Sequence, residues 1–249
     1  MCTVVYIPKD NSVFFASLRD ESPLRDNAIE PRIYNDNDVE YLAPKDALAG
    51  GTWVGVNEFN NVIILLNGGF ENHIKQSSYR KSRGLIVTEL LQSELPVIEW
   101  NLMDMTNIEP FTLVVWSDNN LFQLVWDGQE KHKTLMDATI PHIWSSSTLY
   151  NPSIKTHRKQ LFDNWIETNP TFSLLNILNF FKSFADKENG FIMNRSETLS
   201  TLSYSFIEIQ NSEKVIFNYL DFQSNQNTNT VFNVHNAFTL LTNSIKSSD

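Results

Sequence analysis

The chain of 249 residues has one cysteine, at position 2. A single cysteine excludes an internal disulfide and a zinc site built from several cysteines. Basic residues are also scarce: 19 lysines and arginines stand against 29 aspartates and glutamates, for a formal net charge of −10. Nucleic-acid phosphates bind to basic surfaces, so this balance argues against a nucleic-acid-binding protein.

Long apolar runs are missing as well. No segment approaches the roughly 20 apolar residues that span a bilayer, and the first ten residues lack a basic start and reach charge at Lys9. We therefore expect no integral membrane segment, no secretory signal and a cytoplasmic location. The five histidines show neither HxH nor HExxH spacing, and GxGxxG and P-loop motifs are absent. We expect no metal site and no cofactor.

The residues that are present favour an antiparallel α+β fold. Hydrophobic residues make up 41% of the chain, enough for a substantial core. Apolar, β-branched segments predict strands at 2–7, 13–17, 52–56, 62–66, 111–116, 121–126, 133–136, 201–209 and 215–222. Helical spacing predicts helices at 84–92, 152–168 and 173–187, the second with Ile154, His157, Leu161 and Trp165 along one face. Residues 20–44, interrupted by three prolines, predict a long loop. No linker or repeat is visible, so we expect one domain over residues 1–249.

The position of the cysteine is the most informative feature. Once Met1 is removed, Cys2 is the first residue and carries both a thiol and a free α-amino group. The amino group has an intrinsic pKa of about 7.7–8.0, so it serves as a base near neutral pH and no histidine is needed. Cys2 is therefore a candidate N-terminal nucleophile. The alternative is a small apolar residue at the start of a strand.

Two further segments carry candidate site residues. If strands 2–7 and 13–17 pair, Arg19 and Asp20 lie near the N-terminus, where Arg19 lowers the pKa of the thiol and Asp20 orients the amino group. Asn67 ends strand 62–66 before two glycines, and its side-chain N–H suits an oxyanion. The alternatives are a solvated charged turn and a turn asparagine.

Together these segments resemble the NRDE family, also called the transport and Golgi organisation family, which is similar to N-terminal-nucleophile hydrolases. The resemblance rests on Met1-Cys2-Thr3, Arg19-Asp20-Glu21 with a further arginine at position 25, Gly50-Gly51-Thr52-Trp53-Val54-Gly55 and Leu66-Asn67. It continues in residues 82–87, 110–115 and 146–149 and is faint beyond about residue 165. It implies a four-layer αββα sandwich with Cys2 as nucleophile, as in related hydrolases that cleave amides of bile salts or penicillins. Cys2, Arg19, Asp20 and Asn67 match its motifs.

The sequence departs from the family pattern at three positions. Leu18 replaces an asparagine of the name-giving tetrad, Ser147 replaces an asparagine that supports the oxyanion site in related hydrolases, and Leu199 replaces an arginine that contacts the active centre. These changes weaken the amidase interpretation, but the nucleophile, its amine and Arg19 are retained.

Three hypotheses remain open. The first is a thiol-dependent amide hydrolase or acyl transferase that acts on a small-molecule substrate through Cys2. The second is a non-catalytic binding or trafficking protein for an apolar ligand, because the resembled family has been linked to haem and to lipid or acyl-CoA cargo. The third is a scaffold that keeps the fold without either activity.

Overall fold

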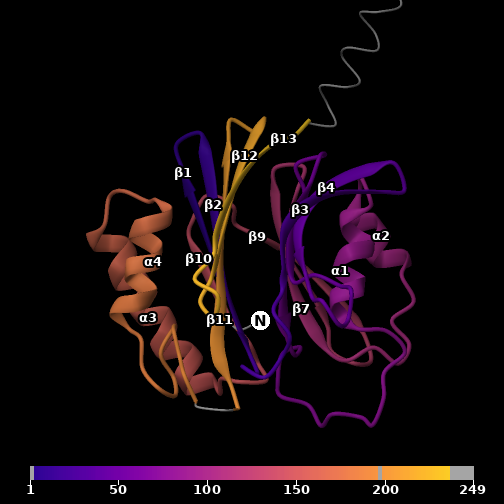
Figure 1. Cartoon of the computed structure of the whole chain (residues 1–249), viewed down its shortest axis with the longest axis horizontal. Helices are drawn as coiled ribbons and strands as arrows, with labels where there is room; N and C mark the ends of the chain where they lie inside the picture. Colours follow the sequence, from indigo (N-terminus) through magenta and orange to yellow (C-terminus); the bar gives the residue numbers. More distant parts are fainter. Residues whose placement is uncertain (1–2, 196–197, 236–249) are drawn as a thin grey trace, which may run out of the picture.

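The protein is built from four layers in the order helices, sheet, sheet, helices (Figure 1). The computed structural model describes residues 3–195 and 198–235. Neighbouring strands are antiparallel in both sheets. The layers confirm the predicted αββα sandwich.

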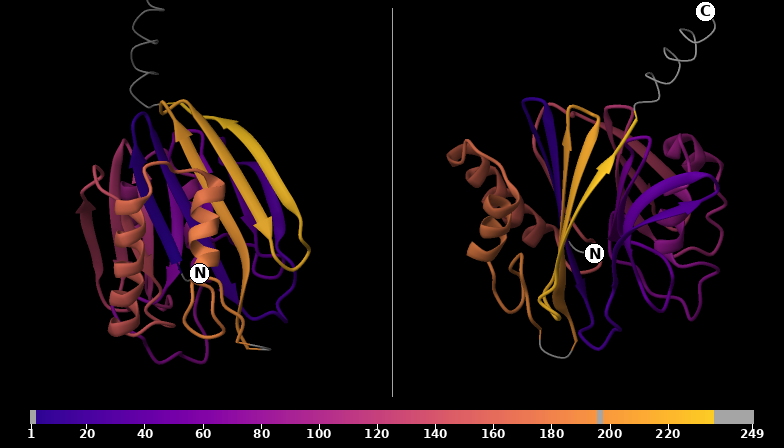
Figure 2. Two further views of the ribbon diagram at one scale, coloured as in Figure 1. Left: turned by 90° about the vertical axis from the view of Figure 1, so that its left-hand side faces the viewer. Right: turned by 45° about the horizontal axis from the view of Figure 1, so that its top comes forward.

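The first sheet has six strands, and helices α3 and α4 cover its outer face (Figure 2). In spatial order its strands are β10 (His142–Ser145), β1 (Thr3–Lys9), β2 (Ser12–Glu21), β11 (Ser200–Gln210), β12 (Lys214–Asp221) and β13 (Asn227–Asn233). The covering helices are α3 (Pro152–Thr168) and α4 (Leu174–Ser183).

The second sheet has seven strands, and α1 and α2 lie on its outer side (Figure 1). In spatial order its strands are β3 (Ile29–Asp36), β4 (Val39–Lys45), β5 (Val54–Asn57), β6 (Val62–Asn67), β7 (Phe111–Ser117), β8 (Asn120–Trp126) and β9 (Lys131–Met136). The helices are α1 (Arg83–Leu91) and α2 (Pro96–Leu102).

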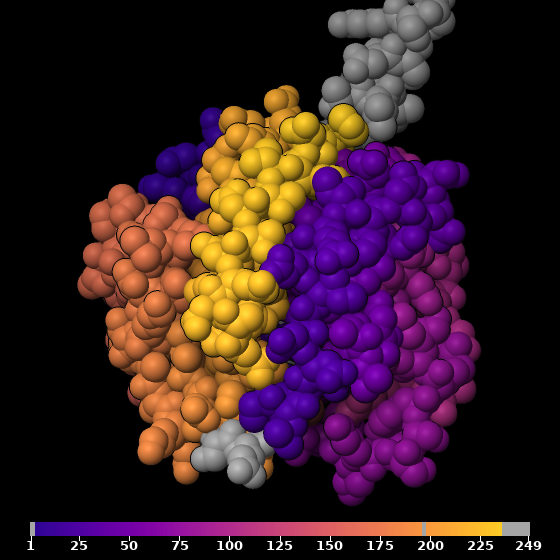
Figure 3. Space-filling model, in the orientation of Figure 1, coloured from indigo at the N-terminus to yellow at the C-terminus, as the bar shows by residue number. Residues whose placement is uncertain are grey.

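Strand alternation on β2 decides which side chains face which layer. Phe15 packs in the core that joins the two sheets, whereas Ala16 and Leu18 pack in the core beneath α3 and α4. Since successive side chains of a strand point to opposite faces, Arg19 faces the second sheet and Asp20 faces the helices. The first sheet meets the second along one edge, where β13 contacts β3 (Figure 3).

The predicted hairpins and most of the predicted helices are confirmed. The first hairpin pairs β1 with β2 in a register that sets Thr3 opposite Leu18. The helix predicted to begin after Asn151 does so, and the Asn151 side chain caps it by accepting a hydrogen bond from the amide of Ile154 at 3.0 Å. Cys2, with which the first predicted strand begins, lies outside the described residues.

The prediction of a long loop over residues 20–44 was wrong. Strands β3 and β4 form a hairpin there around Asn37 and Asp38, whose φ angles of 55° and 61° are typical of a type I′ turn. Pro31 lies inside β3, which is an edge strand, at a register shift between Ile29 and Arg32. A proline at a bulge in an edge strand removes no hydrogen bond from the interior of the sheet.

Smaller differences concern short elements. Helix α4 ends at Ser183 rather than near residue 187. The sequence patterns do not predict α2, with seven residues, or β10, with four. They also give no assignment for the tail after residue 225, where β13 pairs with β12. Elements this short lack enough periodic positions to be recognised from spacing alone.

Candidate active site

Arg19 is the buried cation at the end of β2. Only 5% of its surface is exposed, and its guanidinium carbon lies 4.2 Å from the centroid of the Trp53 ring. Its Nη2 atom donates a hydrogen bond to Asp46 Oδ2 at 3.2 Å. Burial lowers the pKa of the guanidinium, although nearby acidic groups oppose this shift. An arginine nevertheless stays charged in proteins, so a fixed cation stands between the two sheets.

Asp46 is shared between two arginines. Its Oδ2 atom also accepts a hydrogen bond from Arg25 Nε at 2.6 Å, while Oδ1 accepts from the amides of Leu48 and Ala49 at 3.1 and 2.8 Å. Burial raises the pKa of this carboxyl, but the hydrogen bonds from Arg25 and Ala49 outweigh it and hold the pKa below its usual range. One carboxylate thus fixes the position of Arg19 and closes the turn that follows β4.

A cavity of about 470 Å³ opens beside Arg19. Arg19 and Asn67, both predicted site residues, line it together. Its wall also contains Trp53 and the segment that begins α1, Ser82 to Gly84. Gly51, the second glycine of the pair before Trp53, has a steric role, since a Cβ at this position would collide with the backbone of Gly84. The glycine motif therefore lets the start of α1 approach the cavity.

Asn67 is positioned by contacts to its backbone. The carbonyl oxygen of Asn67 accepts a hydrogen bond from Ser146 Oγ at 2.7 Å, and that of Gly69 accepts from Ser147 Oγ at 2.5 Å. Gly68 between them has φ 86°, a conformation that favours glycine. Asn67 is half-buried and ends β6, as the sequence predicts.

Asp20 lies on the opposite face of β2 and is not in the wall of this cavity. It is buried, and its Oδ1 atom accepts a hydrogen bond from Thr201 Oγ1 at 2.5 Å. Its Oδ2 atom lies 3.5 Å from the hydroxyl of Tyr150, which donates to it. The structure therefore brings Arg19 and Asn67 together and separates Asp20 from them by the thickness of the strand. Cys2, the predicted nucleophile, lies outside the described residues.

Three positions at which this chain departs from the family pattern, Leu18, Ser147 and Leu199, have well-defined contacts. Leu18 packs in the core beneath α3 and α4. Ser147 Oγ accepts a hydrogen bond from Lys155 Nζ at 2.7 Å, and burial lowers the pKa of that lysine. Leu199 packs against Tyr150 and Met193. Each replacement thus has a packing or hydrogen-bonding role in this chain.

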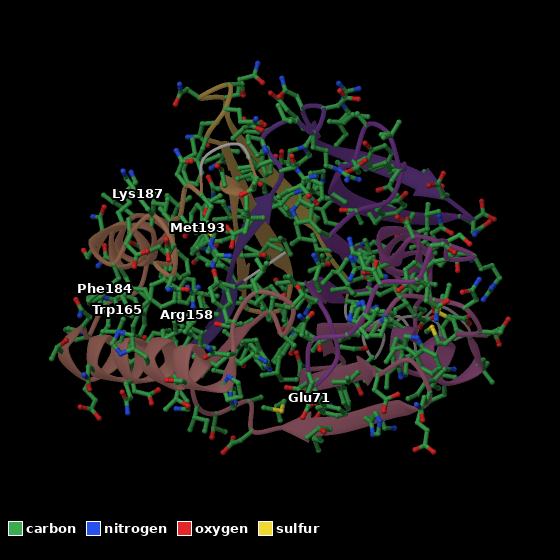
Figure 4. All side chains as sticks on the ribbon, turned by 90° about the horizontal axis from the view of Figure 1, so that it is seen from below. Glu71, Arg158, Trp165, Phe184, Lys187 and Met193 are labelled. Atoms are coloured by element: carbon green, nitrogen blue, oxygen red, sulfur yellow. The ribbon has the colours of Figure 1, made fainter. Side chains whose placement is uncertain are left out.

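Arg158 is a buried arginine that no sequence pattern indicates. It points from α3 toward the first sheet, on the same side of the helix as Trp165 (Figure 4). Its guanidinium donates to the hydroxyl of Thr3, the residue after Cys2, and to the carbonyl of Gly190 at 2.8 Å. Of the predicted face of α3, Ile154, Leu161 and Trp165 pack against buried clusters, whereas His157 is exposed. The fully buried residues of the helix are Arg158 and Phe162.

Solved structures with a similar fold include amide hydrolases. The N-acylethanolamine-hydrolyzing acid amidase (NAAA) ortholog of Caenorhabditis elegans has a TM-score of 0.58 and 9% identity, over 83% of this chain and 92% of that chain. Two variants of the conjugated bile acid hydrolase of Clostridium perfringens have TM-scores of 0.56 and 9% identity, and they cover 92% and 94% of this chain and 92% and 97% of their own. The chain therefore has an N-terminal-nucleophile-hydrolase-like fold.

The family follows from the sequence comparison. The family described as Transport and Golgi organisation 2 matches residues 1–246. The chain belongs to this family, which confirms the resemblance drawn from its motifs. A search of curated proteins finds no match.

No helix in the described part of the chain is both long and apolar enough to cross a membrane. Among residues 3–195 and 198–235, no group of three or more His, Cys, Asp or Glu side chains is arranged to hold a metal ion.

Proposed function

We propose that the protein is a thiol-dependent amide hydrolase or acyl transferase with Cys2 as its nucleophile after removal of Met1. The observation that carries this proposal is the cavity beside Arg19, which also contains Asn67. Cys2 directly precedes Thr3, and Thr3 is the cross-strand partner of Leu18, the residue before Arg19. The chain therefore tethers the thiol within one residue of the strand pair that presents Arg19.

The proposed reaction uses groups with distinct tasks. The α-amino group of Cys2 accepts the thiol proton while the sulfur attacks the amide carbon, and the Asn67 side-chain N–H stabilises the oxyanion. The C–N bond then breaks, and the amino group returns the proton to the departing amine. Water or an acyl acceptor attacks the thioester in a second step and releases the sulfur.

Arg19 and Asp20 have supporting tasks in this scheme. A guanidinium close to a thiol lowers the pKa of the thiol and raises the thiolate fraction at neutral pH. We propose that Asp20 orients the α-amino group, because its carboxylate is buried and held by Thr201. A carboxylate fixed in this way loses little freedom when it accepts one more hydrogen bond.

The cavity lining favours this function over a carrier of apolar cargo. Ligand pockets for apolar groups are lined mainly by hydrophobic side chains. Here Trp53 and Leu65 are outnumbered by charged and hydroxyl side chains. The lining therefore supports a polar, small-molecule substrate.

Mass spectrometry and a panel of amides test the proposal. We expect the untagged protein to lack Met1, a Cys2-linked acyl adduct to accumulate with slow substrates, and Cys2→Ala to lower turnover at least about 10³-fold. Ser17→Ala, which changes another small residue of the β1–β2 hairpin, is the matched control and leaves turnover unchanged. Full retention of Met1, or normal turnover by Cys2→Ala, contradicts the mechanism. A haem titration that shifts the Soret band without any amide turnover favours the carrier instead.

A further inference from the structure

A second cavity of about 310 Å³ adjoins the first at Asn67. Four residues line both cavities: Asn67, Lys75, Arg83 and Glu109. Asn67 is the proposed oxyanion donor, so a substrate whose amide lies at Asn67 extends into this second cavity on one side. We call the second cavity the side cavity.

The shared walls carry more positive than negative charge, although the protein as a whole is acidic. Five cationic side chains and three carboxylates line the larger cavity of a chain with net charge −10. The cations are Arg19, Arg25, Lys75, Lys81 and Arg83, and the carboxylates are Glu21, Asp46 and Glu109. An excess of one sign of charge in a cleft attracts ligands of the opposite sign.

Among the described residues, Glu109 is the one carboxylate that lines the side cavity, and both of its oxygens are engaged. Oε1 lies 3.2 Å from His73 Nε2, and Oε2 lies 3.1 Å from Arg83 Nη2. These contacts direct its charge toward protein groups rather than toward a ligand. Lys75, in contrast, forms no ion pair with any carboxylate in the described part of the chain. A ligand anion entering the side cavity therefore meets an unneutralised ammonium and a positioned guanidinium.

From this arrangement we infer that the side cavity is an anion subsite, and that the substrate is an amide bearing a carboxylate. The carboxylate binds Lys75 and Arg83 while the amide lies at Asn67. The inference rests on the proposed hydrolase function and adds the substrate class to it. Hydrogen bonds between charged groups and a carboxylate are about twice as strong as neutral ones, so loss of the ligand charge weakens binding markedly.

Matched ligand pairs test the subsite without requiring turnover. Calorimetry on the full chain compares 4-acetamidobenzoate with 4-acetamidobenzamide, which has the same shape without the charge. A second pair, succinanilate and its terminal amide, carries the carboxylate on the acyl half. We expect the carboxylate of at least one pair to bind about tenfold more tightly, and the preference to shrink in high salt because both partners are charged.

Variants locate the subsite. Lys75→Gln removes an exposed ammonium with little risk to folding, and Arg83→Gln removes the second cation; each reduces the carboxylate preference to threefold or less. Lys133→Gln, an exposed lysine on β9, is the matched control and preserves the full preference. Equal binding of charged and neutral ligands overturns the inference, as does a preference that both variants retain. If the carboxylate ligands bind through Lys75 but no amide is hydrolysed, the subsite stands and the proposed activity fails.

Discussion

Arg19 and Arg158 are both buried, and each has its guanidinium carbon 4.2 Å from an aromatic ring centroid. Their polar partners differ. Arg158 donates to carbonyl and hydroxyl oxygens on three separate segments of the chain, including those of Thr3 and Gly190. Arg19 is paired with one carboxylate, Asp46, and borders a cavity.

The comparison separates a buried cation that links segments of the fold from one that borders a cavity. Charge-assisted hydrogen bonds to backbone carbonyls hold distant segments together, and Arg158 links α3 to β1, β10 and the loop before Phe191. Arg19 holds fewer segments together, but its charge faces a space that a substrate can enter. Buried charge alone therefore does not indicate a candidate site. Here the adjoining cavity is what distinguishes Arg19.

The largest expected effect is on stability at Arg158. Arg158→Met keeps most of the aliphatic packing but leaves the carbonyl oxygens of Asn189 and Gly190 without their donor. We expect a loss of about 3 kcal/mol or more in the free energy of unfolding, measured by urea denaturation. Lys159→Met, at the exposed neighbouring position of α3, changes it by less than about 0.5 kcal/mol. If Arg158→Met lowers the free energy of unfolding as little as this control does, the hydrogen bonds of Arg158 contribute little to stability.

The second effect is on reactivity at Arg19. Arg19→Met is expected to lower the rate of alkylation of Cys2 by iodoacetamide about tenfold at neutral pH, because a thiol pKa higher by one unit leaves a tenth of the thiolate. The chain has one cysteine, so the modified mass reports on a single site. Arg32→Met, on the exposed edge strand β3, is the control for a general loss of positive charge. An unchanged alkylation rate in Arg19→Met removes Arg19 from the proposed mechanism.

The sequence predicted those strands whose apolar residues form a clear pattern. The apolar, β-branched segments of β1 and β2, with turn residues between them, were enough to predict their pairing, and that pairing placed Arg19 and Asp20 near the residue after Cys2. Strands β3 and β4 were missed because their prolines and charged residues are typical of loops. Only the edge position of β3 and the turn at Asn37 and Asp38 make strands compatible with that composition.

The candidate site was predicted only in the part that local sequence motifs carry. Motif spacing identified Arg19 and Asn67, which line one cavity. The same reasoning did not separate Asp20 from them, although alternation along a strand requires it. Asp46 and Arg158 were not recognised, since their partners include Arg19 and Thr3, which lie 27 and 155 residues away in sequence. No local pattern encodes a contact of that range.

The smallest effect concerns Asp46, the carboxylate that distinguishes the two arginines. Because the pKa of Asp46 is held below its usual range in the folded protein, its stabilising contribution is complete above the unfolded-state pKa of about 3.9 and is lost as the pH falls through the folded-state value. Asp46→Asn is therefore expected to lower the free energy of unfolding by about 1 kcal/mol at pH 7. The difference in the free energy of unfolding between Asp46→Asn and the unmodified protein narrows below about pH 4, as urea denaturation at a series of pH values measures.

In an Arg25→Gln background the same substitution has a smaller effect, since Arg25 supplies the strongest of the hydrogen bonds that lower this pKa. A pH-independent difference in both backgrounds would mean that Asp46 acts through the turn amides alone, and that Arg19 is positioned by packing on Trp53 rather than by charge.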